Sequence, residues 1–126
     1  MEKIFDKALL NSLLEQAKVS PRLRQHFDLR TTIADTSQRM MNALHPETEV
    51  PIHRHEETSE TVVCLTGKLE EIFYEEVDGG KFKETARYLL CPAEGKFGIQ
   101  IPAGVWHTIN VLEPSVIFEA KDGAFN

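Results

Sequence analysis

The chain has 126 residues, with 20 Asp and Glu against 14 Lys and Arg and a hydrophobic share of 41%. This length and composition are typical of one globular domain that can bury a core. No run approaches the roughly 18 apolar residues of a membrane-spanning helix. Residues 40–126 carry seven basic against fifteen acidic side chains, which argues against a nucleic-acid surface because such a surface needs a basic stripe.

The first third of the chain predicts a helical arm. Residues 6–18 have helical periodicity, and Asp6 is a suitable N-cap. We expect one apolar stripe to pack against the rest of the domain or against a partner subunit: Leu9, Leu10, Leu13, Leu14 and Ala17. Ser20-Pro21 is a second helix-start signal and predicts a short helical turn over residues 21–27.

From residue 36 onward the sequence predicts strands. Turn signals such as Thr66-Gly67, Asp78-Gly79-Gly80 and Glu113-Pro114 separate short segments rich in β-forming residues. The predicted strands are 38–44, 50–55, 60–66, 68–75, 86–90, 98–101, 107–111 and 115–120, and the charged residues of 74–86 predict an exposed hairpin tip. About eight short strands in about 85 residues are typical of an all-β barrel or jelly roll.

Three histidines and a glutamate form a candidate metal site. His53 and His55 are two residues apart, so on a strand they share one face. Glu60 begins the next predicted strand, and His107 follows the turn of Pro102-Ala103-Gly104. Imidazoles and a carboxylate can hold one divalent metal. We expect His26 and His45, which lack this spacing, to serve other purposes.

The ligand set narrows the metal only to a class. Three His and one Glu leave one or two positions of a five- or six-coordinate metal open for water or ligand. Mixed nitrogen and oxygen ligands suit Zn, Fe, Mn, Ni, Co or Cu. No cysteine lies within residues 53–60 or beside His107, which argues against an iron–sulfur centre. Cys64 and Cys91 lack CxxC spacing and are predicted to be buried free thiols.

Two motifs resemble those of the cupin superfamily. His53-x-His55, followed after four residues by Glu60 and after six more by Gly67, resembles the first cupin motif. Pro102-x-Gly104-x-x-His107 looks like the second. The resemblance implies an all-β fold, a cupin (jelly-roll) β-barrel over residues 36–121 with an N-terminal helical arm (1–35) and a C-terminal tail (122–126). Glu60 has the cupin spacing, which Glu56, Glu57 and Glu70 lack.

A narrower resemblance covers almost the whole chain. Segments 20–24, 101–107 and 118–123 look like those of the WbuC-type cupin metalloproteins, whose genes are often found among bacterial O-antigen and surface-polysaccharide clusters. The resemblance implies a small metal-binding cupin that acts on a carbohydrate or other small polar metabolite in surface-polysaccharide metabolism. Cupins commonly pair, so it also implies a homodimer. The N-terminus, residues 1–7, carries acidic residues and is followed by a helical pattern and not by an apolar signal core, which predicts a cytoplasmic protein.

Three function classes stay open at this stage. The first is an isomerase or epimerase that uses a metal to assist proton transfer, and the second is an Fe(II)-dependent dioxygenase. The third is a non-catalytic, metal-dependent sugar-binding or sensor module, which we keep because the sequence shows no strong general base beyond the ligands. No nucleic acid or membrane partner is expected.

Three arginines are candidates for substrate binding. Arg39 lies on a predicted strand, where it would orient a carboxylate or phosphate inside the barrel unless its head group reaches solvent. Arg22 and Arg24 form a basic cluster with Arg30, which is either a phosphate site for a ligand such as a sugar nucleotide, or a solvated face or subunit contact.

Overall fold

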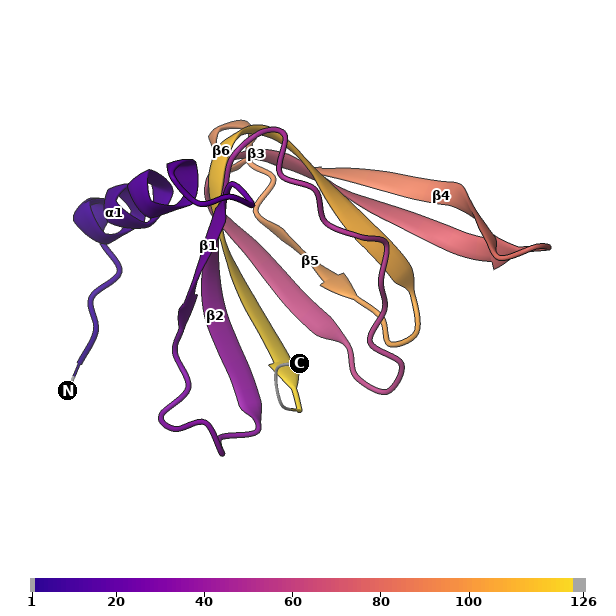
Figure 1. The fold of residues 1–126 in the computed structure, drawn as a ribbon, viewed down its shortest axis with the longest axis horizontal. Helices are drawn as coiled ribbons and strands as arrows, with labels where there is room; N and C mark the ends of the chain where they lie inside the picture. The colour runs from indigo at the N-terminus through magenta and orange to yellow at the C-terminus, as the bar shows by residue number, and fades with distance from the viewer. Residues whose placement is uncertain (1, 124–126) are drawn as a thin grey trace.

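An antiparallel sheet that bends over on itself makes up most of the protein (Figure 1). The structure, a computed structural model, describes residues 2–123. Its strands are β1 (Arg24–Asp28), β2 (Ser37–Leu44), β3 (Glu60–Val77), β4 (Lys81–Leu90), β5 (Gly98–Ile101) and β6 (Trp106–Asp122). Their order is β1-β2-β6-β3-β4, and β5 pairs with the first part of β3. A 3-10 turn, Pro92–Glu94, links β4 to β5.

The long strands β3 and β6 bend together at their middle. The sequence predicted chain-breaking turns at Thr66-Gly67 and Glu113-Pro114, and both predictions are wrong, because each strand continues through the bend and the two remain paired there with shifts of register. Gly67 has a φ of 99°, and a Cβ on it would lie 2.3 Å from the Pro114 carbonyl oxygen. The Ser115 hydroxyl accepts the Lys68 N–H at 2.9 Å and donates to the Glu113 carbonyl at 2.7 Å, which fixes the bend.

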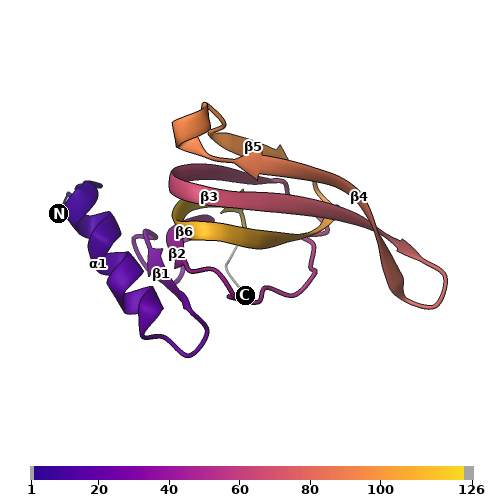
Figure 2. The ribbon, with the colours of Figure 1, turned by 90° about the horizontal axis from the view of Figure 1, so that it is seen from above.

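The bend gives the sheet a concave face that holds the larger core. Its buried residues come from every strand except β1: Leu44, Val62, Cys64, Leu69, Leu90, Ile101, Val111 and Ile117. β1 and β4 end the strand order and do not pair with each other, so the barrel is not closed, and Figure 2 shows them on opposite sides of the sheet. The expected antiparallel β fold is therefore confirmed, whereas closure of the sheet into a barrel is not.

The one α-helix within residues 2–123, α1 (Lys7–Lys18), packs on the convex face of β1, β2 and β6. The Asp6 carboxylate accepts the Leu9 N–H at 2.9 Å, as the predicted N-cap should. The predicted apolar stripe packs against the sheet, where its buried members Leu13 and Ala17 meet Met41, Ala43 and Val116. His45 donates from Nε2 to the Leu14 carbonyl at 2.8 Å, which ties the helix to the turn after β2.

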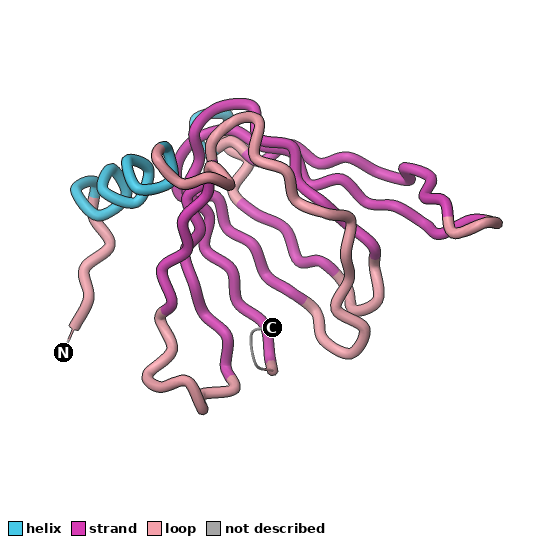
Figure 3. The backbone as a smooth tube through the Cα atoms, viewed as in Figure 1, coloured by secondary structure: helices cyan, strands magenta, loops and turns pink. Residues whose placement is uncertain are grey.

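Two local predictions are wrong. Residues 21–27 do not form a helical turn, because Arg24–Asp28 pairs with β2 as an edge strand and Phe27 packs beneath the helix. Residues 50–55 do not form a strand, since this segment lies in the long loop between β2 and β3, drawn in pink in Figure 3. The hairpin of β3 and β4 projects from the domain and is exposed at Asp78-Gly79-Gly80, as predicted.

Other expectations have mixed outcomes. Both cysteines are free and buried. Across residues 2–123, no helix is long and apolar enough to span a bilayer. The predicted tail at 122–126 lies mostly outside the described residues. The division into an arm and a barrel stays a prediction.

Candidate metal centre

The histidine-bearing loop is held along residues 104–108, where β6 begins. Val50 accepts a hydrogen bond from the Thr108 hydroxyl at 2.5 Å, and His55 accepts one from the Gly104 N–H at 2.8 Å. Between them, His53 and His107 exchange two backbone hydrogen bonds, of 3.0 and 2.8 Å. These anchors hold the loop extended, so two histidines that are not on a strand still face the same side.

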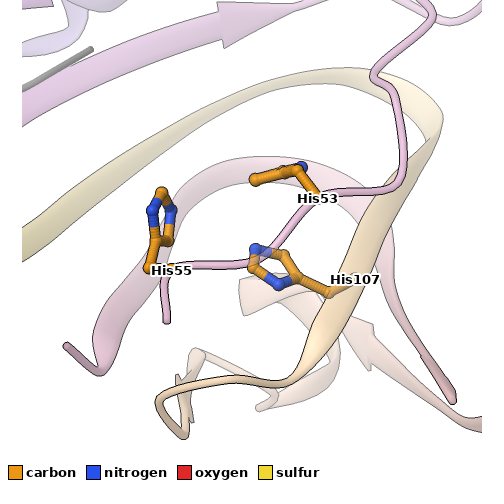
Figure 4. A group of neighbouring side chains, drawn as sticks. All are labelled: His53, His55 and His107. Carbon is orange, nitrogen blue, oxygen red and sulfur yellow. The ribbon is translucent and has the colours of Figure 1, made fainter. Parts of the chain in front are cut away.

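The three predicted histidine ligands meet at one point. One ring nitrogen from each of His53, His55 and His107 lies within 4.8 Å of the other two, a spacing that one metal ion can bridge. Figure 4 shows His53 and His55 on the loop and His107 on β6, with their rings turned toward a common space. The ring centroids of His53 and His107 are 4.3 Å apart.

Backbone carbonyls fix which nitrogen two of the three rings present. His53 Nδ1 lies 2.9 Å from the Pro51 carbonyl oxygen, and His107 Nδ1 lies 2.9 Å from that of Val105. A carbonyl can only accept, so each Nδ1 donates and each Nε2 keeps its lone pair. In the described chain, the Nε2 atoms of His55 and His107 are buried and have no hydrogen-bond partner. These residues fit a metal ion, which would satisfy both.

Glu60 lies against two of the three rings. Its carboxylate oxygens are 3.4 Å from His55 Nε2 and 3.8 Å from His107 Nε2. Burial alone would raise the pKa of Glu60, but the nearby His107, with His55 and His53, outweighs burial and lowers it. Glu60 is therefore ionised at neutral pH and suited to be a fourth ligand.

Burial also sets the charge state of the histidines. Burial lowers the pKa of His53, and the neighbouring His107 lowers it further. Burial also lowers the pKa of His55, although the negative charge of Glu60 acts in the opposite direction. Both imidazoles are therefore neutral at physiological pH, and neutral imidazole is the form that binds metal.

Open space lies on both sides of the histidines. An outer groove of about 790 Å³ is lined by His53, His55, Arg54, Trp106 and Lys121, among others. The Arg54 guanidinium stacks 4.4 Å from the Trp106 ring centroid on one wall of it. An inner cavity of about 140 Å³ lies on the concave face and touches His53, His107 and Glu60. A ligand at the metal would therefore have room both outside and inside.

Two further carboxyl groups line the inner cavity, and sequence reasoning missed both. They are Glu71 on β3 and Glu119 on β6. Burial, together with the charges of Glu60 and Glu119, raises the pKa of Glu71 well above its usual value. Burial and Glu60 raise the pKa of Glu119 to about 7. Alternation with Ser115 and Ile117 could have placed Glu119 inside, whereas the bulges before Leu69 hide the orientation of Glu71.

Two of the three candidate arginines, Arg22 and Arg24, lie together, whereas Arg39 lies apart from them. Arg39 lies on the face of β2 opposite to the cavity and pairs with Asp35 at 2.9 Å, so it does not reach the histidines. Arg22 is exposed and lines a hollow near Pro51 together with Arg24. Arg24 lines the inner cavity and donates from Nη1 to the Glu49 carbonyl at 3.2 Å.

Glu119 should make stability depend on pH. The folded protein keeps its proton up to about pH 7, whereas the unfolded chain loses it near 4.5, so the free energy of unfolding falls as pH rises between them. We expect Glu119→Gln to gain stability over the wild type across this range, reaching about 3 kcal/mol at most. Urea denaturation of both proteins without metal, between about pH 5 and about pH 8, measures the difference.

Titration of the histidines does not affect the difference in free energy of unfolding between the wild type and Glu119→Gln. Their lowered pKa values give the opposite slope, because the unfolded chain binds more protons than the folded one below pH 6.5. This contribution is common to both proteins and cancels in the difference. If the free energies of unfolding of the two proteins changed with pH in parallel, Glu119 would not hold its proton in the folded protein, and the prediction would be contradicted.

Solved structures share the fold. CapF of Staphylococcus aureus, a capsular polysaccharide assembling protein, matches with a TM-score of 0.63 and 21% identity over 86% of this chain and 30% of its own. The cupin domain of Schizosaccharomyces pombe Cnp3 matches with a TM-score of 0.55 and 11% sequence identity. This match covers 79% of the present chain and 64% of the Cnp3 chain. YcfD, a ribosomal oxygenase of Escherichia coli solved with cobalt and succinic acid, matches with a TM-score of 0.57 and 20% sequence identity. This match covers 71% of the present chain and 24% of the YcfD chain.

These likenesses establish a cupin-like fold and no more. The chain spans less than a third of CapF and about a quarter of YcfD. No curated protein matches the sequence. A family profile described as a domain of unknown function, DUF6016, matches residues 5–87, a segment that includes His53, His55 and Glu60. Because residues 5–87 are well over half of the 126 residues of the chain, the chain belongs to the DUF6016 family.

Proposed function

We propose that the protein is a metal-dependent cupin that acts on a carbohydrate or other small polar metabolite of surface-polysaccharide metabolism, by proton transfer as in an isomerase or epimerase. The observation that carries the proposal is the convergence of His53, His55 and His107, whose ring nitrogens lie within 4.8 Å of one another beside an ionised Glu60. His53, His55, Glu60 and His107 are the proposed ligands.

The fold comparison supports the choice of substrate class. CapF, described as a capsular polysaccharide assembling protein, has the same fold over most of this chain. The WbuC-type resemblance of the sequence points to the same area of metabolism. We also propose, in keeping with that resemblance, that the protein is cytoplasmic and forms a homodimer.

The chain supplies the groups that proton transfer needs. A bound divalent metal would polarise a carbonyl or hydroxyl oxygen of the substrate. Glu119 has a pKa of about 7, close to the value at which a carboxyl group can both accept and return a proton under physiological conditions. Glu71 and Glu119 face the same cavity as His107, so a substrate group placed there would lie beside both carboxyl groups. Glu119 is therefore a candidate for the general base that the sequence did not reveal, and this supports the catalytic proposal over the non-catalytic one.

Two measurements test the proposal. Elemental analysis of protein purified without a histidine tag should find about one divalent transition metal per chain. The metal-loaded protein, incubated in D₂O with a panel of sugar nucleotides, should place solvent deuterium on a carbon of one of them. Chelator-treated protein is the control, and a protein that takes up no metal would contradict the proposal.

A second candidate is an Fe(II)-dependent dioxygenase. It is favoured by the shared fold of YcfD, an oxygenase whose structure was solved with cobalt, and by a ligand set that suits iron. Protein reconstituted with Fe(II) should then consume oxygen in the presence of an organic substrate. The non-catalytic sugar-binding module stays the alternative if a sugar stabilises the protein and is never converted.

A further inference from the structure

A hollow of about 440 Å³ lies beside the inner cavity and shares a wall with it. Arg24 lines both spaces. Glu49 and Pro51 of the histidine-bearing loop line the hollow. Val50 and His53, farther along the same loop, line the inner cavity. Arg24 and this loop therefore form the shared wall, so a ligand in the inner cavity lies next to the hollow.

The hollow holds two guanidinium groups that no carboxylate neutralises. Arg22 and Arg24 line it, and across residues 2–123 neither forms an ion pair. Arg24 is half-buried, and within the same residues its guanidinium makes one hydrogen bond, to the Glu49 carbonyl at 3.2 Å. A carbonyl leaves the positive charge in place, so Arg24 calls for an anion that the protein does not provide. Arg30 of the same basic cluster is instead paired with Asp28 at 2.8 Å.

The backbone around the hollow is unusual as well. Within residues 2–123, the two non-glycine residues with a positive φ are Leu23 at 57° and Glu47 at 77°. Both line the hollow, and backbone conformations of this kind cluster at ligand-binding sites. The Leu23 carbonyl accepts the His45 N–H at 3.0 Å, and the Arg22 carbonyl accepts the Thr48 hydroxyl at 2.6 Å. The two turns are therefore tied together, which holds the arginines beside the hollow.

A phosphate group matches this arrangement. A phosphate monoester carries about two negative charges at neutral pH, which balance two guanidinium groups, and its oxygens fit the guanidinium fork. A volume of about 440 Å³ leaves room for the rest of an ester. Glu47 and Glu49 also line the hollow, but both are exposed and neither pairs with an arginine in the described chain, so solvent screens their repulsion.

We propose that the hollow lined by Arg22 and Arg24 binds the phosphate group of a phosphorylated small metabolite, such as a sugar phosphate. The phosphate site stands on the two arginines alone. Its link with the metal, in which the uncharged part of the ligand extends past Arg24 into the inner cavity, rests on the proposed function.

Three probes test the site. The full chain, with its metal content recorded, is titrated by calorimetry with inorganic phosphate, glucose 6-phosphate and glucose at constant ionic strength. We expect inorganic phosphate and glucose 6-phosphate to bind with similar affinity, because the phosphate makes the main contacts and the open hollow admits the sugar. Glucose should bind at least about tenfold more weakly than glucose 6-phosphate, because it brings no charge to the arginines.

Three variants assign the binding to the hollow. Arg22→Gln should weaken both phosphate probes at least about fivefold, and the fold should be unaffected because Arg22 is exposed. Glu49→Gln should strengthen both about two- to threefold, since it removes an opposing charge and keeps the backbone carbonyl that holds Arg24. A gain of binding cannot arise from misfolding. Lys81→Gln is the matched control, because it makes the same change in net charge on the projecting hairpin and should leave both affinities unchanged.

The other outcomes overturn the inference. Phosphate that does not bind, or that binds equally well to Arg22→Gln, would show that the arginines form no anion site. Binding of inorganic phosphate without glucose 6-phosphate would show that the site takes the free ion and not an ester. Equal binding of glucose and glucose 6-phosphate would show that the phosphate is not recognised. Failure of the proposed function would appear separately, as protein that holds no metal but still binds both phosphate probes.

Discussion

His107→Ala is expected to lose the metal and a large part of the protein's stability together. His107 is 2% exposed, and its Nε2 is one of the two buried nitrogens that have no partner in the described residues. Loss of an outer partner of a metal ligand already weakens binding by about 10–100-fold, so removal of a ligand should cost at least about a hundredfold. The emptied space should lower the free energy of unfolding of the metal-free protein by about 3 kcal/mol.

Metal content by elemental analysis and urea denaturation measure the two effects. His45→Ala is the matched control, because His45 binds the Leu14 carbonyl on the opposite side of the sheet and should cost stability without changing metal content. A His107→Ala protein that keeps a full complement of metal would show that the site has been assigned to the wrong residues.

Gly67→Ala is expected to destabilise the protein by at least about 3 kcal/mol. Gly67 has a φ of 99°, which an alanine adopts only under strain, and its new Cβ would lie 2.3 Å from both the Pro114 carbonyl oxygen and the Ser115 hydroxyl. The bend of β3 and β6 depends on this close approach. Because the bend brings Glu60 toward His107, metal affinity should fall as well.

Gly79→Ala separates the strain from the clash. Gly79 has a similar φ of 80° in the exposed hairpin turn, but nothing lies within 4 Å of a Cβ placed there. We expect it to cost only about 1 kcal/mol and to leave metal affinity unchanged. Similar losses of stability in the two variants, measured by thermal and urea denaturation, would mean that the contact with the opposite strand is unimportant.

The convergence of the three histidines could be predicted from sequence because their spacing carries the information. His53 and His55 face the same side whether the segment is a strand or an extended loop, so the wrong prediction of a strand at 50–55 did not affect the site. The helix at 6–18 was equally accessible, since Asp6 and the leucine stripe are local signals. Such local signals predict the helix correctly because they do not depend on distant parts of the chain.

The orientation of Glu71 and the continuity of the two long strands could not be predicted, because they depend on contacts between distant segments that local sequence patterns do not show. Alternation puts Glu60, Val62 and Cys64 on one face, and it would place Glu71 on the other. The register shifts between Cys64 and Leu69 reverse the alternation, and Glu71 turns inward. Likewise, Gly67 and Pro114 look like chain breaks, and only their position opposite each other in a paired bend shows that both strands continue.

The pairing of β3 with β6 also has a kinetic consequence. Glu60 pairs with Lys121 and Tyr74 with Trp106, so the central ladder forms between segments that are distant in sequence. Topologies of this kind fold in milliseconds to seconds, because long loops must close before the contacts repay the lost entropy. The histidine loop can attach to β6 only after that strand is in place. Capture of a cation should therefore mark the last step of folding rather than nucleate it.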